Sequence, residues 1–267
     1  ALETWPQSGV PDKPEAWLLT VARHRLIDAA RHAQVRSAAT AELLMITDEA
    51  TELTNLGTTF PDERLKLMFI CAHPAIDAAA RTPLMLQTVL GLDLARIASA
   101  FLVRPAAMGQ RLSRVKRKIR DAGIAFEIPE ARELLPRLDA VLETVYAAYG
   151  SGWDDVSGSD NLHKGLAAEA VDLGRLLLAL LPAEPEAQGL LALMLHCEAR
   201  QDARRTADGA YIPLMEQDVA RWSWPQIEAA EKLLHAAQRG ERIGRFQLEA
   251  AIQSAHARRA AAGATDG

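Results

Sequence analysis

The stretch LDLARIASAFLVRPAAMGQRLSRVKRKIRD, residues 92–121, predicts two helices joined by a tight turn. In the first helix, residues 92–101, apolar side chains recur at helical spacing on one face. Pro105 suits the first turn of the second helix, where the N–H that proline lacks would have no intrahelical partner. The apolar side of this second helix consists of Met108, Leu112, Val115 and Ile119. The pattern indicates a helix-turn-helix.

The opposite side of the second helix is strongly basic. From Arg104 to Arg120 the chain carries seven Lys or Arg residues and no acid, although its formal net charge is -5. A basic stripe on an acidic chain favours nucleic-acid binding. Such a helix fits the major groove, with its N-terminal half near base edges and its later cations near phosphates. We predict that these residues contact DNA: Arg104, Gln110, Arg111, Arg114, Lys116, Arg117 and Lys118.

Roles within this set follow from donor chemistry. Arginine pairs with guanine edges and glutamine with adenine, so Gln110, Arg111 and Arg114 are the candidates for base or phosphate contact. The remaining cations are expected to neutralise phosphate. A basic helix face is also a common solvated surface, and the residues alone leave that interpretation open.

Composition favours an all-α protein of more than one domain. The 267 residues suffice for two or more cores, alanine and leucine dominate, and aromatic residues make up only 5%. No apolar run approaches the length of a membrane span, and no signal peptide is visible, so we expect a cytoplasmic protein.

Nothing in the sequence predicts catalysis, a metal or a cofactor. Cys71 with His73, and His196 with Cys197, lack a second ligand pair at zinc-binding spacing. The two cysteines are therefore expected to be free buried thiols. No nucleophile, zinc-protease or phosphate-loop motif occurs.

The N-terminal part is predicted to hold one basic helix and a linker. Residues 14–32 combine an apolar stripe with basic positions, and Trp17 is expected to be a core residue. A weak helix at 39–45 and a linker to residue 60 follow. Asp62 is a predicted N-cap for a helix ending at Cys71, with further helices from residue 75 to 90. Gly123 would stop the basic helix.

The C-terminal half, residues 131–267, is predicted to be helical throughout. Expected helices cover 134–149, 161–181, 186–200, 226–238 and 246–259, with a loop at 150–158 and a turn at Asp208-Gly209. The pair 161–181 and 186–200 is like a tetratricopeptide-type hairpin. A polar-aromatic cluster of Glu216, Asp218, Arg221 and Trp222 is predicted to be a structural salt-bridge knot, with a functional role as the alternative.

Long motifs in order give the chain a resemblance to a known family. WLLTVARHRLIDAAR (17–31) resembles the end of the second conserved region of extracytoplasmic-function sigma factors, which belong to the sigma-70 family of bacterial RNA polymerase. DERL (62–65), FICAHPA (69–75), IASAFLV (97–103) and MGQRLSRVKRKIRDAGIAF (108–126) are similar to the fourth region, in the subgroup with a long C-terminal extension. Gly109 stands where alanine is usual.

The resemblance implies an organisation and a function. Residues 1–37 would be the end of region two, 38–60 a linker, 61–130 the region-four helix-turn-helix domain, and 131–267 a regulatory extension. The protein would recognise promoter DNA and direct RNA polymerase core. Residues 105–120 would read the upstream element, and Arg23, His24, Arg25 and Arg31 would meet the downstream element. Family members begin with polymerase-binding helices, and this chain starts after them.

Two other classes of function remain open from the residues alone. One is a helix-turn-helix regulator that binds DNA without polymerase, which would need a dimer and a palindromic site. The other is a helical protein-interaction scaffold with an incidental basic helix, whose DNA binding would ignore sequence and vanish by physiological salt.

Overall fold

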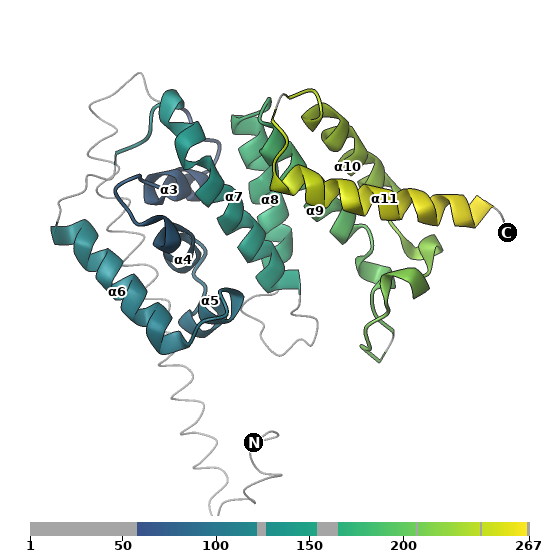
Figure 1. Cartoon of the computed structure of the whole chain (residues 1–267), viewed down its shortest axis with the longest axis horizontal. Coiled ribbons are helices and arrows are strands. Elements are labelled where there is room, and N and C mark those ends of the chain that lie inside the picture. Colours follow the sequence, from purple (N-terminus) through teal and green to yellow (C-terminus); the bar gives the residue numbers. More distant parts are fainter. Residues whose placement is uncertain (1–57, 122–126, 154–164, 207, 241, 266–267) are drawn as a thin grey trace, which may run out of the picture. The chain divides into compact units, whose positions relative to one another are not determined.

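The computed structural model describes residues 58–121, 127–153, 165–206, 208–240 and 242–265. All of them lie within one structural unit, Thr54–Gly267. Within these ranges the chain forms α-helices, short 3-10 helices and one isolated β-bridge, so the predicted all-α fold is confirmed (Figure 1). The predicted helices at 14–32 and 39–45 and the stop at Gly123 lie outside the described residues.

Four helices build the helix-turn-helix half: α3 (Glu63–Cys71), α4 (Ala78–Thr88), α5 (Leu94–Ala100) and α6 (Pro105–Asp121). An aspartate side chain accepts a backbone N–H at the start of α3, α4 and α5: Asp62, Asp77 and Asp93 respectively. The predicted cap at Asp62 is confirmed. The predicted start of the next helix at Ala75 was wrong, because the chain turns through residues 72–77 and Asp77 caps the helix.

Five α-helices build the described part of the C-terminal half: α7 (Ala131–Trp153), α8 (Leu166–Leu180), α9 (Pro185–Glu198), α10 (Trp224–Ala237) and α11 (Arg245–Thr265). The short 3-10 helices η1 (Gln201–Ala203), η2 (Leu214–Glu216) and η3 (Val219–Arg221) lie between α9 and α10. The predicted turn at Asp208-Gly209 is confirmed by the bridge between Arg205 and Tyr211 and by the positive φ of Gly209, 90°.

The C-terminal end of α7 corrects the sequence prediction. A loop was expected from residue 150, yet α7 continues to Trp153. The Ser151 hydroxyl donates to the Ala147 carbonyl at 2.8 Å, within the helix. A Cβ on Gly152 would lie 2.4 Å from the Ala167 nitrogen, so this glycine admits the start of α8 against the helix rather than ending the helix.

Helix α9 is the central helix of the C-terminal half. Its residues are buried without interruption from Ala187 to His196. A helix that is apolar on all sides needs neighbours on all sides. Here α9 packs mainly against α10 and α11, whereas α8 packs mainly against α7 (Figure 1). Helices α8 and α9 of the predicted hairpin do touch, but each packs more extensively against another helix.

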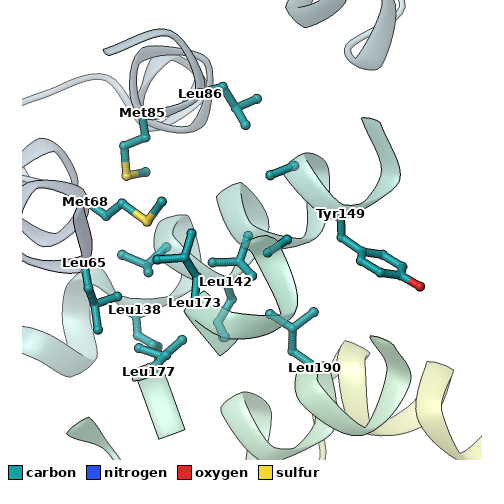
Figure 2. Packing of buried hydrophobic residues seen from close by; sticks show 14 of the residues in the cluster. Leu65, Met68, Met85, Leu86, Leu138, Leu142, Tyr149, Leu173, Leu177 and Leu190 are labelled. Atoms are coloured by element: carbon teal, nitrogen blue, oxygen red, sulfur yellow. The ribbon is translucent and has the colours of Figure 1, made fainter. Parts of the chain in front are cut away.

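One hydrophobic core joins the two halves. Leu65 and Met68 of α3 and Met85 and Leu86 of α4 belong to the same buried cluster as leucines of the C-terminal helices, which include Leu138, Leu142, Leu173, Leu177 and Leu190. Figure 2 shows Met68, Met85 and Leu65 directed toward Leu138 and Leu142 of α7. The helices on both sides of the predicted boundary near residue 130 thus share their interior.

Polar contacts cross the same interface. Arg137 of α7 is only 4% exposed, and its Nη1 donates to the Phe69 carbonyl at 3.2 Å, near the end of α3. Its Nη2 pairs with Glu133 at 2.8 Å, one turn earlier in α7. Arg64 of α3 forms an ion pair with Glu169 of α8. These polar bonds fix the position of α3 relative to α7 and α8.

Replacing Arg137 by methionine tests this bond. The change keeps the apolar stem and removes the donor to the Phe69 carbonyl, so we expect the free energy of unfolding to fall by about 1–3 kcal/mol in urea titrations. Arg132→Met is the control, because Arg132 is 81% exposed and pairs with Glu130 on the surface. It should change stability by less than about 0.5 kcal/mol. Equal effects of the two substitutions would contradict the role of Arg137.

Candidate DNA-binding surface

The turn between α5 and α6 has a defined and strained geometry. The Leu102 N–H donates to the Ser99 carbonyl at 3.0 Å, and the Val103 N–H donates to the Ala98 carbonyl at 2.9 Å. Leu102 adopts φ 53°, the left-handed region that branched and bulky residues rarely enter. Its side chain is 95% exposed, so no packing contact compensates the backbone strain.

The inner face of α6 fixes the helix against its neighbours. Met108, Leu112 and Val115 are buried, and Ile119 is half-buried, as the apolar spacing predicted. A Cβ on Gly109 would lie 3.2 Å from the Leu94 Cδ2 atom of α5. That contact is tighter than most Cβ contacts, so glycine allows the two helices of the motif to pack closely at this position.

The outer face of α6 presents the predicted DNA-binding side chains. Gln110, Arg114 and Arg117 are exposed and succeed one another at spacings of four and three, which places them in one row along the helix. Lys118 and Arg120 flank this row; Lys118 is exposed. Arg104 is exposed in the turn, and Arg111 is half-buried at the edge. Across the described ranges, no carboxylate pairs with any of these side chains.

Lys116 differs from the other predicted contacts. Its Nζ donates to the Gln87 Oε1 atom of α4 at 2.8 Å, and the residue is half-buried. Burial lowers the pKa of its ammonium group. Lys116 therefore fixes α6 against α4 and is turned away from the row of Gln110, Arg114 and Arg117.

The predicted contacts to the downstream element belong to the N-terminal part of the chain. Arg23, His24, Arg25 and Arg31 lie outside the described residues and stay a prediction. Within α6 the basic charge is offset only by its last residue, Asp121, because the first turn holds no acid and basic residues continue into the last turn.

The cysteine and histidine pairs have structural surroundings. Burial raises the pKa of the Cys71 thiol to about 12. The His73 Nδ1 atom accepts the Ala75 N–H at 3.1 Å. Burial lowers the pKa of His196 to about 4, and Cys197 is only partly covered. In the part of the chain that the structure describes, no three His, Cys, Asp or Glu side chains cluster as a metal site would need.

The cluster at 216–222 is not the predicted salt-bridge knot. Glu216, Asp218 and Arg221 form no ion pair with one another, and Glu216 and Asp218 are exposed. Asp218 instead caps η3 by accepting the Ala220 N–H at 3.0 Å. Trp222 is buried, and the Arg200 guanidinium lies over its ring at 5.8 Å.

None of the helices in the described ranges is long and apolar enough to span a membrane.

Comparisons with known proteins point to the C-terminal half and to one long relative. Residues 137–238 match a family of unknown function, DUF6596. The chain is 40% identical over 262 residues to an uncharacterised protein of Rhizobium meliloti (strain 1021). This match covers 97% of the chain but only 62% of the relative, so the chain spans less than two thirds of that protein. No solved structure matches the chain.

Replacing Leu102 by glycine should make the protein more stable. Removing the Cβ relieves about 1–2 kcal/mol of left-handed strain, which exceeds the cost of the added backbone freedom. We expect a net gain of about 0.5–1 kcal/mol in urea titrations. Leu102→Ala keeps the Cβ and should leave stability nearly unchanged. A glycine variant no more stable than the alanine variant would show that the turn is unstrained.

Proposed function

We propose that the chain is a sigma-factor-like transcription initiation protein that recognises promoter DNA and directs bacterial RNA polymerase. The observation that carries the proposal is the α5–α6 motif. One side of α6 is buried, and the other presents Gln110, Arg114 and Arg117 to solvent on a chain whose formal net charge is -5. A helix of this kind presents polar side chains to base edges and cations to phosphates.

The sequence motifs and the family match support this function over a general DNA-binding role. The stretches 62–75 and 97–121 resemble the fourth region of sigma factors, and the structure describes both within consecutive helices of one bundle. Domains of the family matched by residues 137–238 are found in sigma-70-like proteins. A chain with both features fits a promoter-recognition protein that carries a C-terminal extension.

Roles can be assigned along α6 from position and exposure. Gln110 and Arg114 stand in the exposed row and can reach base edges. Arg104, Arg117 and Lys118 are exposed and suited to phosphate, and Arg111 lies at the edge of the surface. Arg23, His24, Arg25 and Arg31 would serve the downstream element.

The C-terminal half is proposed to be regulatory. Its helices share a core with α3 and α4, so they are an integral part of the promoter-recognition unit. The outer side chains of α6 remain exposed with these helices in place. The described helices of the C-terminal half do not cover α6. Control by this half would therefore act through a different contact.

The salt dependence of DNA binding separates α6 side chains that face DNA from those that face the protein. With about five phosphates contacted, log K should fall against log salt with a slope of roughly -4 to -5. Arg117→Met should reduce the magnitude of that slope by about 1, while Lys116→Met, which removes a contact to Gln87, should leave it nearly unchanged. Fluorescence anisotropy with a labelled promoter duplex measures both. A larger change for Lys116→Met would contradict the orientation of α6.

Transcription by bacterial core polymerase tests the function itself. We expect the full-length gene product that contains this chain to start transcription at a promoter selected by its own DNA binding. Gln110→Ala with Arg114→Ala should abolish that initiation and keep core binding, since each lost base contact costs about 1–3 kcal/mol.

Other outcomes of the same experiment distinguish the alternatives. Sequence-specific DNA binding without any binding to core polymerase would replace the proposal by a polymerase-independent regulator. Sequence-blind binding that disappears at physiological salt would indicate the interaction scaffold.

A further inference from the structure

A cavity lies at the C-terminal end of α7. Its volume is about 410 Å³, within the range of pockets that hold small organic ligands. It is bounded by the ends of α7 and α9, by the segment that carries Tyr211 and Leu214, and by one side of α11. No residue of the cavity belongs to the candidate DNA-binding surface.

Aromatic rings form much of the wall. Tyr146, Tyr149 and Trp153 project from successive turns of α7, and Tyr211 of the β-bridged turn also lines the cavity. Tyr149 and Trp153 lie 5.3 Å apart between ring centroids and are tilted to each other. Figure 2 shows the Tyr149 hydroxyl directed away from the buried leucines. Walls of this kind suit a flat ring, which gains from offset or edge contacts as well as from burial.

Two arginines, Arg200 and Arg204, line the same cavity. Arg204 lies over the Trp153 ring at 4.2 Å and over the Tyr211 ring at 5.8 Å, and it donates to the Trp153 carbonyl at 3.3 Å. Arg200 is held by the amide oxygen of Gln253 at 2.6 Å and by the Trp222 ring. Among the described residues, no carboxylate contacts Arg200.

The described acids near the cavity are engaged elsewhere, so they do not neutralise Arg200. Glu249 is the acidic residue among those that line the cavity, and its carboxylate already pairs with Arg245 at 2.7 Å. Glu198 accepts the Tyr149 hydroxyl at 2.9 Å. Burial raises the pKa of the Glu198 carboxyl. The Arg200 Nε also donates to the His196 carbonyl at 3.3 Å, so a ligand carboxylate would bind Nη1 through a charge-assisted hydrogen bond.

We propose that this cavity binds a small planar aromatic carboxylate, with its ring beside the aromatic residues of the lining and its carboxylate on Arg200. The site is a small-molecule site of the C-terminal half. It goes beyond promoter recognition, and it needs neither DNA nor polymerase to be occupied.

The probe for the test is 2-naphthoate, with the neutral 2-naphthamide as its matched analogue. Binding is measured by saturation-transfer NMR and isothermal titration on the full chain without DNA. We expect naphthoate to bind at least about tenfold more tightly than the amide, which corresponds to the loss of a charge-assisted hydrogen bond. Equal binding of both probes, or no binding of naphthoate at millimolar concentration, would overturn the proposal.

Variants place the probe in the cavity. Arg200→Met should weaken naphthoate binding by about tenfold and should bring it close to the amide. Arg175→Met is the control, because Arg175 is an exposed residue of α8 that pairs with Asp172 at 2.6 Å outside the lining. Ile252→Trp narrows the cavity from an exposed position of α11 and should abolish binding without affecting the fold.

Thermal unfolding of each variant by circular dichroism shows whether it remains folded. Undiminished naphthoate binding in Arg200→Met and Ile252→Trp would exclude this cavity. Because DNA is absent throughout, these results do not depend on the proposed transcription function, and failure of that function would leave them unchanged.

Discussion

The structure depends on the contact between the helix-turn-helix bundle and α7. A helix-turn-helix of short helices has too little apolar surface to form a stable core alone, since small units bury a small share of their surface. Here the apolar sides of α3 and α4 close against Leu138 and Leu142 of α7. Arg137 adds a directional bond at the edge of this contact, from the interior of α7 to a carbonyl near the end of α3. Helix α6 packs against α4 and α5, so the C-terminal half supports it through these two neighbours.

This arrangement changes how the C-terminal half can be studied. Removing residues 131–267 would strip α7 from the shared core and expose Met68 and Met85. Loss of activity in such a truncation would report loss of the bundle, whether or not the removed helices regulate anything. Substitutions on the side of α7 that faces away from α3 and α4, or in α9–α11, would leave the contact of α7 with α3 and α4 intact. They can therefore separate a regulatory role of the C-terminal half from its structural role.

Much of the helix-turn-helix could be predicted from the sequence because its signals are local. The spacing of Met108, Leu112 and Val115 marks the buried side of α6, and Pro105 marks its first turn. The cap at Asp62 needs only the residues that follow it. Periodicity separates the buried side of α6 from its exposed side, but Lys116 lies between the two. The direction of the Lys116 side chain depends on Gln87 of α4, which it contacts.

The features that the sequence did not reveal depend on contacts between distant segments. Arg137 pairs with a backbone carbonyl 68 residues away, and every residue offers such a carbonyl. Gly152 resembled a helix-breaking residue, yet its role is to admit α8. The cavity also assembles from four separated segments. The all-round burial of α9 did have a signal, since its apolar residues leave no polar side.

Helix α7 is the physical connection between the two surfaces of the molecule that carry proposals. Its 23 residues span about 35 Å, with Arg137 near one end and Trp153 at the other. A shorter connection also exists, because the Arg96 Nη1 atom of α5 donates to the Ser151 carbonyl at 3.3 Å, two residues before Trp153. A ligand among the aromatic residues would thus lie close to a hydrogen bond that reaches the first helix of the motif. Proximity alone transmits nothing: a ligand alters DNA affinity only if it binds the DNA-bound and free forms unequally. Any such effect is reciprocal, so DNA would change ligand affinity by the same factor.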